Sequence, residues 1–245
     1  MVLCYCIQIY FDFSGYSDMA RGISKLFGIE LPVNFDSPYK AVNIADFWKR
    51  WHISLTSFLT RYLYIPLGGN RKGKWRTYLN VMIVFVVSGL WHGPSLNYII
   101  WGFMNGAAMV FYRVFKAKID RIPKFINWFV TFVFVNICWV MFRAGSIDEF
   151  VQIVGSLVSF EAGSINSNLL ACFNLISVHT VFDGIFQNPY LFYLYCLIVV
   201  VILCGRNLNK RVFEPNAVVL LVTVFVFVFA LCSLSNISTY IYQWF

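Results

Sequence analysis

The feature that most limits the fold of this chain is the run from Thr77 to Tyr112, which contains no Lys, Arg, Asp or Glu. Across all 245 residues only 12% are charged and 60% are hydrophobic. A soluble domain has about 25% charged residues, so this chain has too few polar side chains to cover a water-soluble globule. We therefore predict an all-α polytopic membrane protein.

Five apolar segments are candidates for full transmembrane helices, because a helix needs roughly 20 apolar residues to cross the hydrocarbon layer. They are Tyr78–Trp91, Leu96–Tyr112, Phe125–Phe142, Tyr190–Gly205 and Ala217–Ser235. The first residues, MVLCYCIQIYF, are typical of the end of a further, partial transmembrane helix rather than of a signal peptide. We therefore expect a chain that starts inside a larger protein, with residues 1–245 forming a single membrane domain.

The charges between these segments predict a topology. Basic residues outnumber acidic ones in segments 21–76, 113–124 and 206–214, whereas acidic residues dominate in segment 143–189. Because Lys and Arg are retained on the cytoplasmic side of membrane proteins, we place the basic segments inside and expect 143–189 to be an external loop. The same rule accounts for the net charge of +8, so no nucleic-acid partner is expected.

Residues 43–65 have a different pattern, with apolar side chains at helical spacing and charged or hydroxyl side chains between them. Asn43, followed three residues later by Asp46, resembles a helix N-cap. The pattern predicts one amphipathic helix lying in the cytoplasmic interface. On such a helix His52 is in line with Trp48, on the apolar side or at its margin.

His92 is the most informative polar residue, since it stands inside the charge-free run and is followed by Gly93 and Pro94. Proline disfavours a helix at the residue before it, so we expect one helix to end at His92–Gly93 and another to begin near Pro94. The predicted topology places His92 past the midplane of the bilayer. A buried neutral imidazole can act as a general base. The alternative is a structural histidine that is hydrogen-bonded to a neighbouring helix.

Other candidate groups have weaker signals. The stretch GGNRKGKWR could hold a phosphate or an acyl carrier, although anchors to anionic lipid headgroups have the same composition; its cations are Arg71, Lys72, Lys74 and Arg76. The third histidine, His179, falls in the external polar segment and is expected to be a surface residue. The seven cysteines include no C-x-x-C pair, so we expect neither a disulfide framework nor a metal site.

Four motifs occur in order between Tyr10 and Asn105: FDFSGYSDMARG, NFDSPY, FWKRWHISLTSFLTRYLYIPLGGNRKG and GLWHG. Together they resemble the membrane-bound O-acyltransferase family, in particular its bacterial branch of alginate O-acetyltransferases and D-alanyl transfer proteins of teichoic acid synthesis. The resemblance implies a ring of helices around a thinned core that is crossed by a tunnel. Members of this family are longer, so the chain resembles the C-terminal half of one.

The resemblance also implies the chemistry. His92, in the WHG motif, would be the essential residue, and His52, in the RWHIS motif, would be the second invariant histidine. An acetyl group would pass from a cytoplasmic thioester, either acetyl-CoA or an acyl carrier protein, to a cell-envelope or exported polysaccharide. An external partner acyltransferase would take part, no cofactor would be bound, and the protein would lie among the lipids of the bacterial cytoplasmic membrane. The donor would approach near His52, while His92, deeper in the bilayer, deprotonates the acceptor hydroxyl.

Two other kinds of protein remain open. One is a truncated, non-catalytic membrane remnant, or a subunit that needs an N-terminal half. The other is a proton-coupled transporter with His92 as its proton relay, although the five predicted spans contain none of the carboxylates that such transporters usually have.

Overall fold

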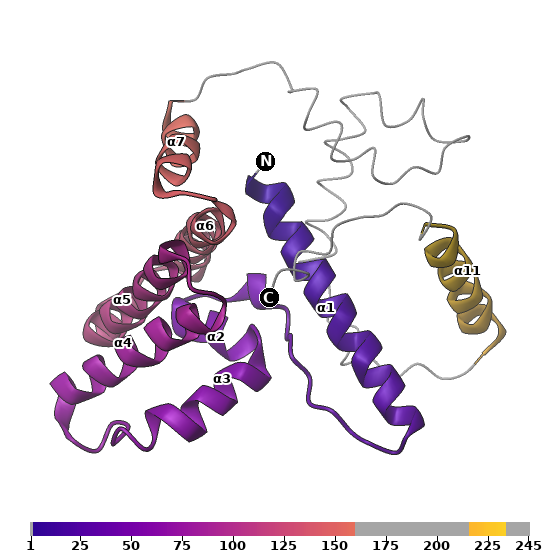
Figure 1. Cartoon of the computed structure of the whole chain (residues 1–245), viewed down its shortest axis with the longest axis horizontal. Coiled ribbons are helices and arrows are strands. Elements are labelled where there is room, and N and C mark those ends of the chain that lie inside the picture. Colours follow the sequence, from indigo (N-terminus) through magenta and orange to yellow (C-terminus); the bar gives the residue numbers. More distant parts are fainter. Residues whose placement is uncertain (1, 160–215, 234–245) are drawn as a thin grey trace. The chain divides into compact units, whose positions relative to one another are not determined.

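The computed structural model describes residues 2–159 and 216–233, and every regular element in these ranges is helical (Figure 1). The all-α prediction is therefore confirmed for this part of the chain. The elements are α1 (Val2–Leu26), the short 3-10 turn η1 (Pro38–Lys40), α2 (Ile44–Arg50), α3 (Ile53–Leu59), the π-helical turn η2 (Thr60–Tyr64), α4 (Gly73–Trp91), α5 (Leu96–Ile119), α6 (Lys124–Arg143), α7 (Ile147–Val158) and α11 (Ala217–Ser233). Helices α1 to α7 and helix α11 belong to two separate compact units, so α11 is described by itself.

The number of membrane spans stays a prediction. Among the described residues, α6 is the helix that is long and apolar enough to cross a membrane, and a shorter apolar helix covers Ala217–Val228 within α11. Helices α4 and α5 cover the first two predicted spans. The predicted span Tyr190–Gly205, most of the predicted loop 143–189 and His179 lie outside the described residues.

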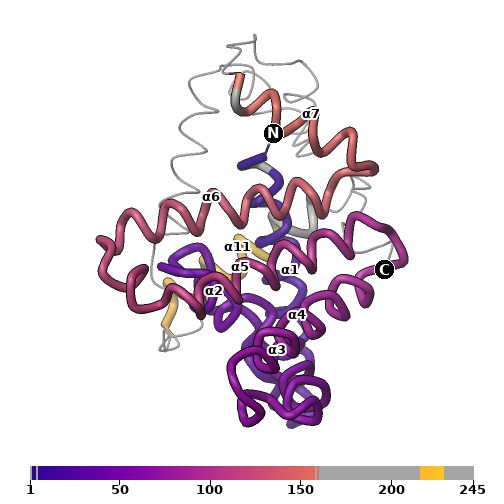
Figure 2. The backbone as a smooth tube through the Cα atoms, turned by 90° about the vertical axis from the view of Figure 1, so that its left-hand side faces the viewer, coloured from indigo at the N-terminus to yellow at the C-terminus, as the bar shows by residue number. Residues whose placement is uncertain are grey.

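Helices α4 and α5 form an antiparallel hairpin in which the two backbones approach closely (Figure 2). A Cβ atom at Gly89 would clash with the carbonyl oxygen of Tyr98, and one at Gly102 would clash with the carbonyl oxygen of Phe85. Small residues at such a contact allow close packing of membrane helices. The hairpin therefore fixes the position of the turn between the two helices.

Polar contacts join the hairpin to α6, and join α6 to α1. The Asn97 side chain, on α5, donates a hydrogen bond to the carbonyl of Ala144 at the end of α6. The Trp128 indole of α6 donates to the carbonyl of Tyr39 at 2.8 Å, and the Tyr39 hydroxyl donates to the carbonyl of Cys6 on α1, also at 2.8 Å. Tyr39 therefore connects α1 with α6.

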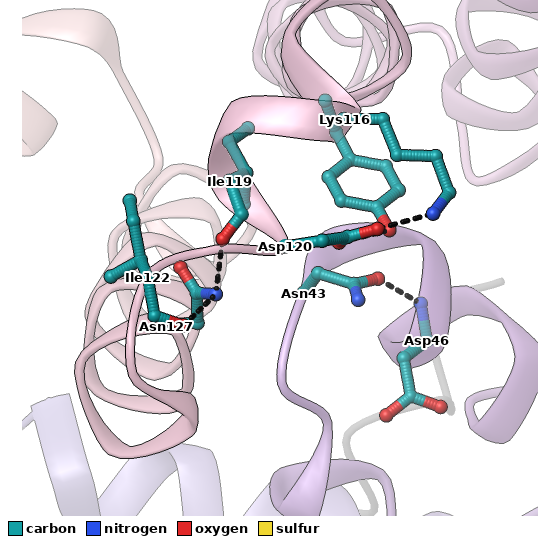
Figure 3. A network of polar contacts seen from close by, with 8 residues as sticks. Asn43, Asp46, Lys116, Ile119, Asp120, Ile122 and Asn127 are labelled. Carbon is teal, nitrogen blue, oxygen red and sulfur yellow. Dashed lines mark hydrogen bonds and ion pairs between the residues drawn. The ribbon is translucent and has the colours of Figure 1, made fainter.

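The prediction of one continuous helix over 43–65 is wrong. Helix α2 ends at Arg50, and α3 begins at Ile53 after a residue in the left-handed conformation, His52, with φ 45° and ψ 55°. The predicted N-cap is confirmed, because Asn43 Oδ1 accepts a hydrogen bond from the Asp46 backbone N–H at 2.8 Å (Figure 3). The position of this segment at the membrane interface stays a prediction.

Two further boundaries differ from the prediction. The N-terminal helix continues beyond its apolar start as far as Leu26, and the predicted loop 143–189 begins with helix α7. Ser146 Oγ accepts from the Glu149 backbone N–H at 3.1 Å, while Glu149 Oε2 accepts from the Gly145 backbone N–H at 2.8 Å. This reciprocal capping is the reason that a helix starts there.

Candidate functional site

The break between α2 and α3 is stabilised by Asn34, a residue from the preceding extended segment. Its backbone carbonyl accepts from the Ile53 N–H at 3.0 Å. Its side-chain oxygen accepts from the Ser54 N–H at 3.0 Å and from the Ser54 hydroxyl at 2.6 Å. His52 precedes α3 but makes no side-chain cap, so Asn34 supplies the cap that a helix start requires.

The same extended segment also holds the end of α2. The Asp36 N–H donates to the Arg50 carbonyl at 2.9 Å, and the Arg50 guanidinium donates back to the Asp36 carbonyl at 3.2 Å. The NFDSPY motif is therefore hydrogen-bonded on both sides of His52. Sequence reasoning used this motif for the resemblance and missed the structural role of Asn34, because nothing local shows which distant helix an asparagine caps.

The His52 ring lies in an aromatic environment. It packs edge-on against Phe13 of α1, with ring centroids 4.7 Å apart and an interplanar angle of 88°, and it also contacts Trp91. Its Nδ1 atom is buried and has no hydrogen-bond partner among the described residues. Burial lowers the pKa of His52, which lies outside the predicted spans, to about 4, so its imidazole is neutral at pH 7.

His92 caps the C-terminus of α4, where its backbone N–H bonds to the carbonyls of Gly89 and Leu90. The residue is only 6% exposed. Its ring centroid lies 5.4 Å from that of Trp101 and 5.1 Å from that of Phe142. Aromatic side chains therefore surround an imidazole that comes from the turn of the hairpin.

The predicted helix break after His92 is confirmed. Helix α4 ends at Trp91 and α5 starts at Leu96, with Ser95 as its N-cap. Gly93 has φ 146°, a conformation that L side chains rarely adopt, and a Cβ atom there would lie 2.9 Å from the Tyr98 ring. Glycine is therefore required at this turn.

The structure brings the two predicted histidines together at Trp91. The Trp91 ring centroid lies 4.9 Å from that of His92 and 6.2 Å from that of His52. We expected His52 and His92 to occupy separate positions along a path through the membrane; the structure shows that one indole contacts both rings, and their depths in the bilayer stay a prediction. Trp91 is 60% exposed, so the histidines lie close to the surface of this unit.

The predicted basic cluster lies away from the histidines. Its four residues are exposed and occupy the turn before α4 and the first residues of that helix: Arg71, Lys72, Lys74 and Arg76. Because α4 has 19 residues, its length of about 28 Å separates this cluster from His92. The Asn80 side chain holds the turn by donating to the carbonyls of Gly69 at 2.9 Å and Leu67 at 3.3 Å. A contact of these cations with lipid or a carrier protein stays a prediction.

Comparison with known proteins gives the same assignment as the motifs. A sequence model of the MBOAT, or membrane-bound O-acyltransferase, family matches residues 1–147. That segment contains both histidines and the hairpin that carries His92.

Curated relatives of several specificities resemble the chain. The peptidoglycan O-acetyltransferase of Helicobacter pylori is 37% identical over 98% of this chain and 48% of that protein. The probable alginate O-acetylase AlgI of Pseudomonas putida is 44% identical over 64% of this chain and 33% of its own length. The teichoic acid D-alanyltransferase of Bacillus subtilis is 34% identical over 46% of this chain and 30% of that protein.

The chain spans about half the length, or less, of these curated relatives. The family match nevertheless covers more than half of this chain and includes the elements that bring His52 and His92 to one indole. On this evidence the chain belongs to the membrane-bound O-acyltransferase family.

Proposed function

We propose that the chain carries the two acyl-transfer histidines of an O-acyltransferase that modifies a cell-envelope or exported polysaccharide. The observation that supports this most is the convergence of His52 and His92 on the Trp91 indole. The two residues come from different motifs and different helices, so their meeting is a property of the fold and not of local sequence.

In this proposal His92 is the general base. Its neutral imidazole takes the proton from the acceptor hydroxyl while the hydroxyl oxygen attacks the thioester carbonyl. The new C–O ester bond forms, the C–S bond breaks, and the departing thiolate receives the proton. Apolar rings around His92 support this role, because they exclude water that would otherwise hydrolyse the thioester.

His52 is proposed as the second functional histidine. Its buried Nδ1, which has no partner among the described residues, is available to hydrogen-bond a substrate atom beside Trp91. The shared contact with Trp91 supports a site at which the donor and the acceptor meet beside both imidazoles.

The transferred group, its donor, the partner protein and the location in the membrane belong to the same proposal. The transferred group is acetyl, supplied on the cytoplasmic side by acetyl-CoA or an acyl carrier thioester. An external partner acyltransferase carries it to the polysaccharide, and the protein crosses the bacterial cytoplasmic membrane several times. The functions of the relatives, peptidoglycan O-acetylation and alginate O-acetylation, support an envelope or exported acceptor.

A second candidate function follows from the length comparison. Since the chain spans about half of its relatives, it is a candidate subunit that acts together with a second polypeptide. In that case the same histidines require the partner before any transfer occurs.

The test is expression of the chain in a bacterium that lacks its own envelope O-acetyltransferase, followed by measurement of the acetate that mild alkali releases from the envelope. We expect release with the wild-type chain and none with His92→Ala, at equal abundance of both proteins in the membrane. His179→Ala is the matched control and should retain full release.

The outcomes separate the candidates. Full acetate release by His92→Ala would remove this residue from the mechanism. Release only when the N-terminal half of the Helicobacter pylori relative is co-expressed would support the subunit function. No release under either condition would leave the non-catalytic alternative.

A further inference from the structure

A half-enclosed cavity of about 450 Å³ lies between α2, α3, η2, α4 and α5. Its volume falls in the range of small-molecule sites. Most of its lining is apolar and comes from α2 to α5: Trp48, Leu55, Leu59, Val81, Val84, Phe85 and Met109. Such a lining suits an aliphatic chain, because burial of each methylene group is favourable.

Cations lie at the edge of this apolar lining. Lys49, Arg113 and Lys116 all contribute to the cavity wall. Lys116 forms an ion pair with Asp120 (Figure 3). Lys49 and Arg113 form no ion pair within the described part of the chain. The mouth of the cavity therefore has positive charge that no carboxylate of this part neutralises.

The Arg113 side chain is held in position at that mouth. Its guanidinium donates to the Tyr64 hydroxyl at 3.3 Å and lies 5.9 Å from the centre of the Tyr64 ring. Tyr64 belongs to η2, which also lines the cavity. The contact holds the guanidinium without neutralising its charge.

The cavity is separate from the histidine site. Neither His52 nor His92 lines it. Trp48 forms part of its wall and packs against Trp101 at a ring centroid distance of 5.8 Å, and Trp101 in turn contacts His92 at 5.4 Å. Trp101 is only 2% exposed. The buried Trp101 indole therefore lies in contact with both a wall residue of the cavity and His92, while neither histidine is part of the lining.

We propose that this cavity binds one anionic phospholipid, with an acyl chain in the apolar part and the phosphate against Lys49 and Arg113. An apolar lining with cations on one side is complementary to such a molecule, and basic pockets between membrane helices on the cytoplasmic side bind anionic lipid headgroups. The basic segments 21–76 and 113–124, which contain Lys49 and Arg113, are both predicted to lie on that side by the charge pattern. This binding does not depend on the proposed acyl transfer.

The test is the lipid content of the full chain, purified from bacterial membranes in a mild detergent and analysed by native mass spectrometry. We expect the wild-type chain to retain a phosphatidylglycerol or another anionic phospholipid. The double variant Lys49→Gln/Arg113→Gln should bind added phosphatidylglycerol about 25-fold more weakly, because each basic residue near an anionic lipid contributes about fivefold. The matched control is Lys118→Gln/Arg121→Gln, which removes the same charge outside the cavity lining.

A second pair of variants tests the apolar part. Val84→Phe fills the cavity and should prevent lipid retention, whereas Val87→Phe, on the same helix but outside the lining, should not. Equal loss in both charge variants, or retention by Val84→Phe, would overturn the proposal. So would purification without lipid, or with a pantetheine thioester in its place. The charge variants decide the result if Val84→Phe fails to fold.

Discussion

His52 and His92 contact the same side chain, the Trp91 indole, at ring centroid distances of 6.2 and 4.9 Å. Trp91 is the last residue of α4 and directly precedes His92. An exposed indole that packs on both imidazoles fixes their rings relative to one another.

The first prediction concerns Trp91 itself. Trp91→Ala should lower acetate release about 10- to 100-fold, because small displacements of reacting groups have effects of this size, while Trp91→Phe should retain most of the activity. Trp75→Ala is the matched control, since Trp75 is 87% exposed near the other end of α4. Equal activity of the Trp91→Ala and Trp75→Ala variants would show that the indole does not position the histidines.

The second prediction concerns Asn34, the distant cap of α3. Asn34→Ala should destabilise the protein by about 1 kcal/mol and also reduce acetate release, because His52 loses its fixed backbone. Asn34→Asp keeps an oxygen acceptor and should restore both properties. Thermal unfolding and acetate release are measured on the same preparations.

Asn43→Ala is the matched control for this experiment. Asn43 caps α2 through Asp46, so its loss should lower stability by a similar amount but leave acetate release nearly unchanged. If Asn34→Ala and Asn43→Ala lower acetate release equally, Asn34 contributes to the stability of the protein and not to the position of His52.

The third prediction concerns Gly93, whose φ of 146° and contact with the Tyr98 ring leave no room for a Cβ atom. Gly93→Ala should lower the melting temperature by about 5 °C, because backbone strain of this kind costs about 1–3 kcal/mol. Gly155→Ala, in α7 with open space around it, should be neutral or slightly stabilising. An unchanged melting temperature for Gly93→Ala would contradict the described turn.

The fourth prediction is a pH dependence that arises from His52. Because burial lowers its pKa to about 4, the unfolded chain binds a proton below about pH 6.5 while the folded chain does not. This residue should therefore reduce stability as the pH falls from about 6.5 to about 4.

The measurement compares melting temperatures at pH 7 and pH 5 for the wild-type chain and His52→Asn, since asparagine also tolerates the left-handed conformation. The wild-type value should fall by about 5 °C more than that of the variant. Parallel curves for the two proteins would mean that His52 is not buried as a neutral group.

The two helix breaks illustrate how much of the site could be predicted. The break at His92 follows from Gly93 and Pro94, which are adjacent in sequence and act locally. The break at His52 has no glycine or proline beside it and depends on hydrogen bonds from Asn34. Sequence periodicity therefore predicted the helical residues of this segment correctly but could not detect a cap supplied by another segment.

The same limit applies to the pairing of the histidines. Both residues could be chosen from their motifs, but their contact with one indole depends on the α2–α3 corner lying beside the end of α4, and no local sequence pattern indicates that. The separation of the basic residues from His92 could be predicted from the sequence, since it follows from the length of α4. Helix α7 was missed although Ser146 and Glu149 have the spacing of a capping box, because the predicted loop was inferred from charge alone.

The close approach of α4 and α5 at Gly89 and Gly102 also limits how the site can move. With backbone against backbone, neither helix can slide or rotate past the other, so the hairpin and His92 at its turn move as one rigid body. An opening that admits a substrate to His92 therefore has to come from displacement of the side chains and helices around the hairpin, such as Phe142 of α6, and not from sliding of α4 against α5.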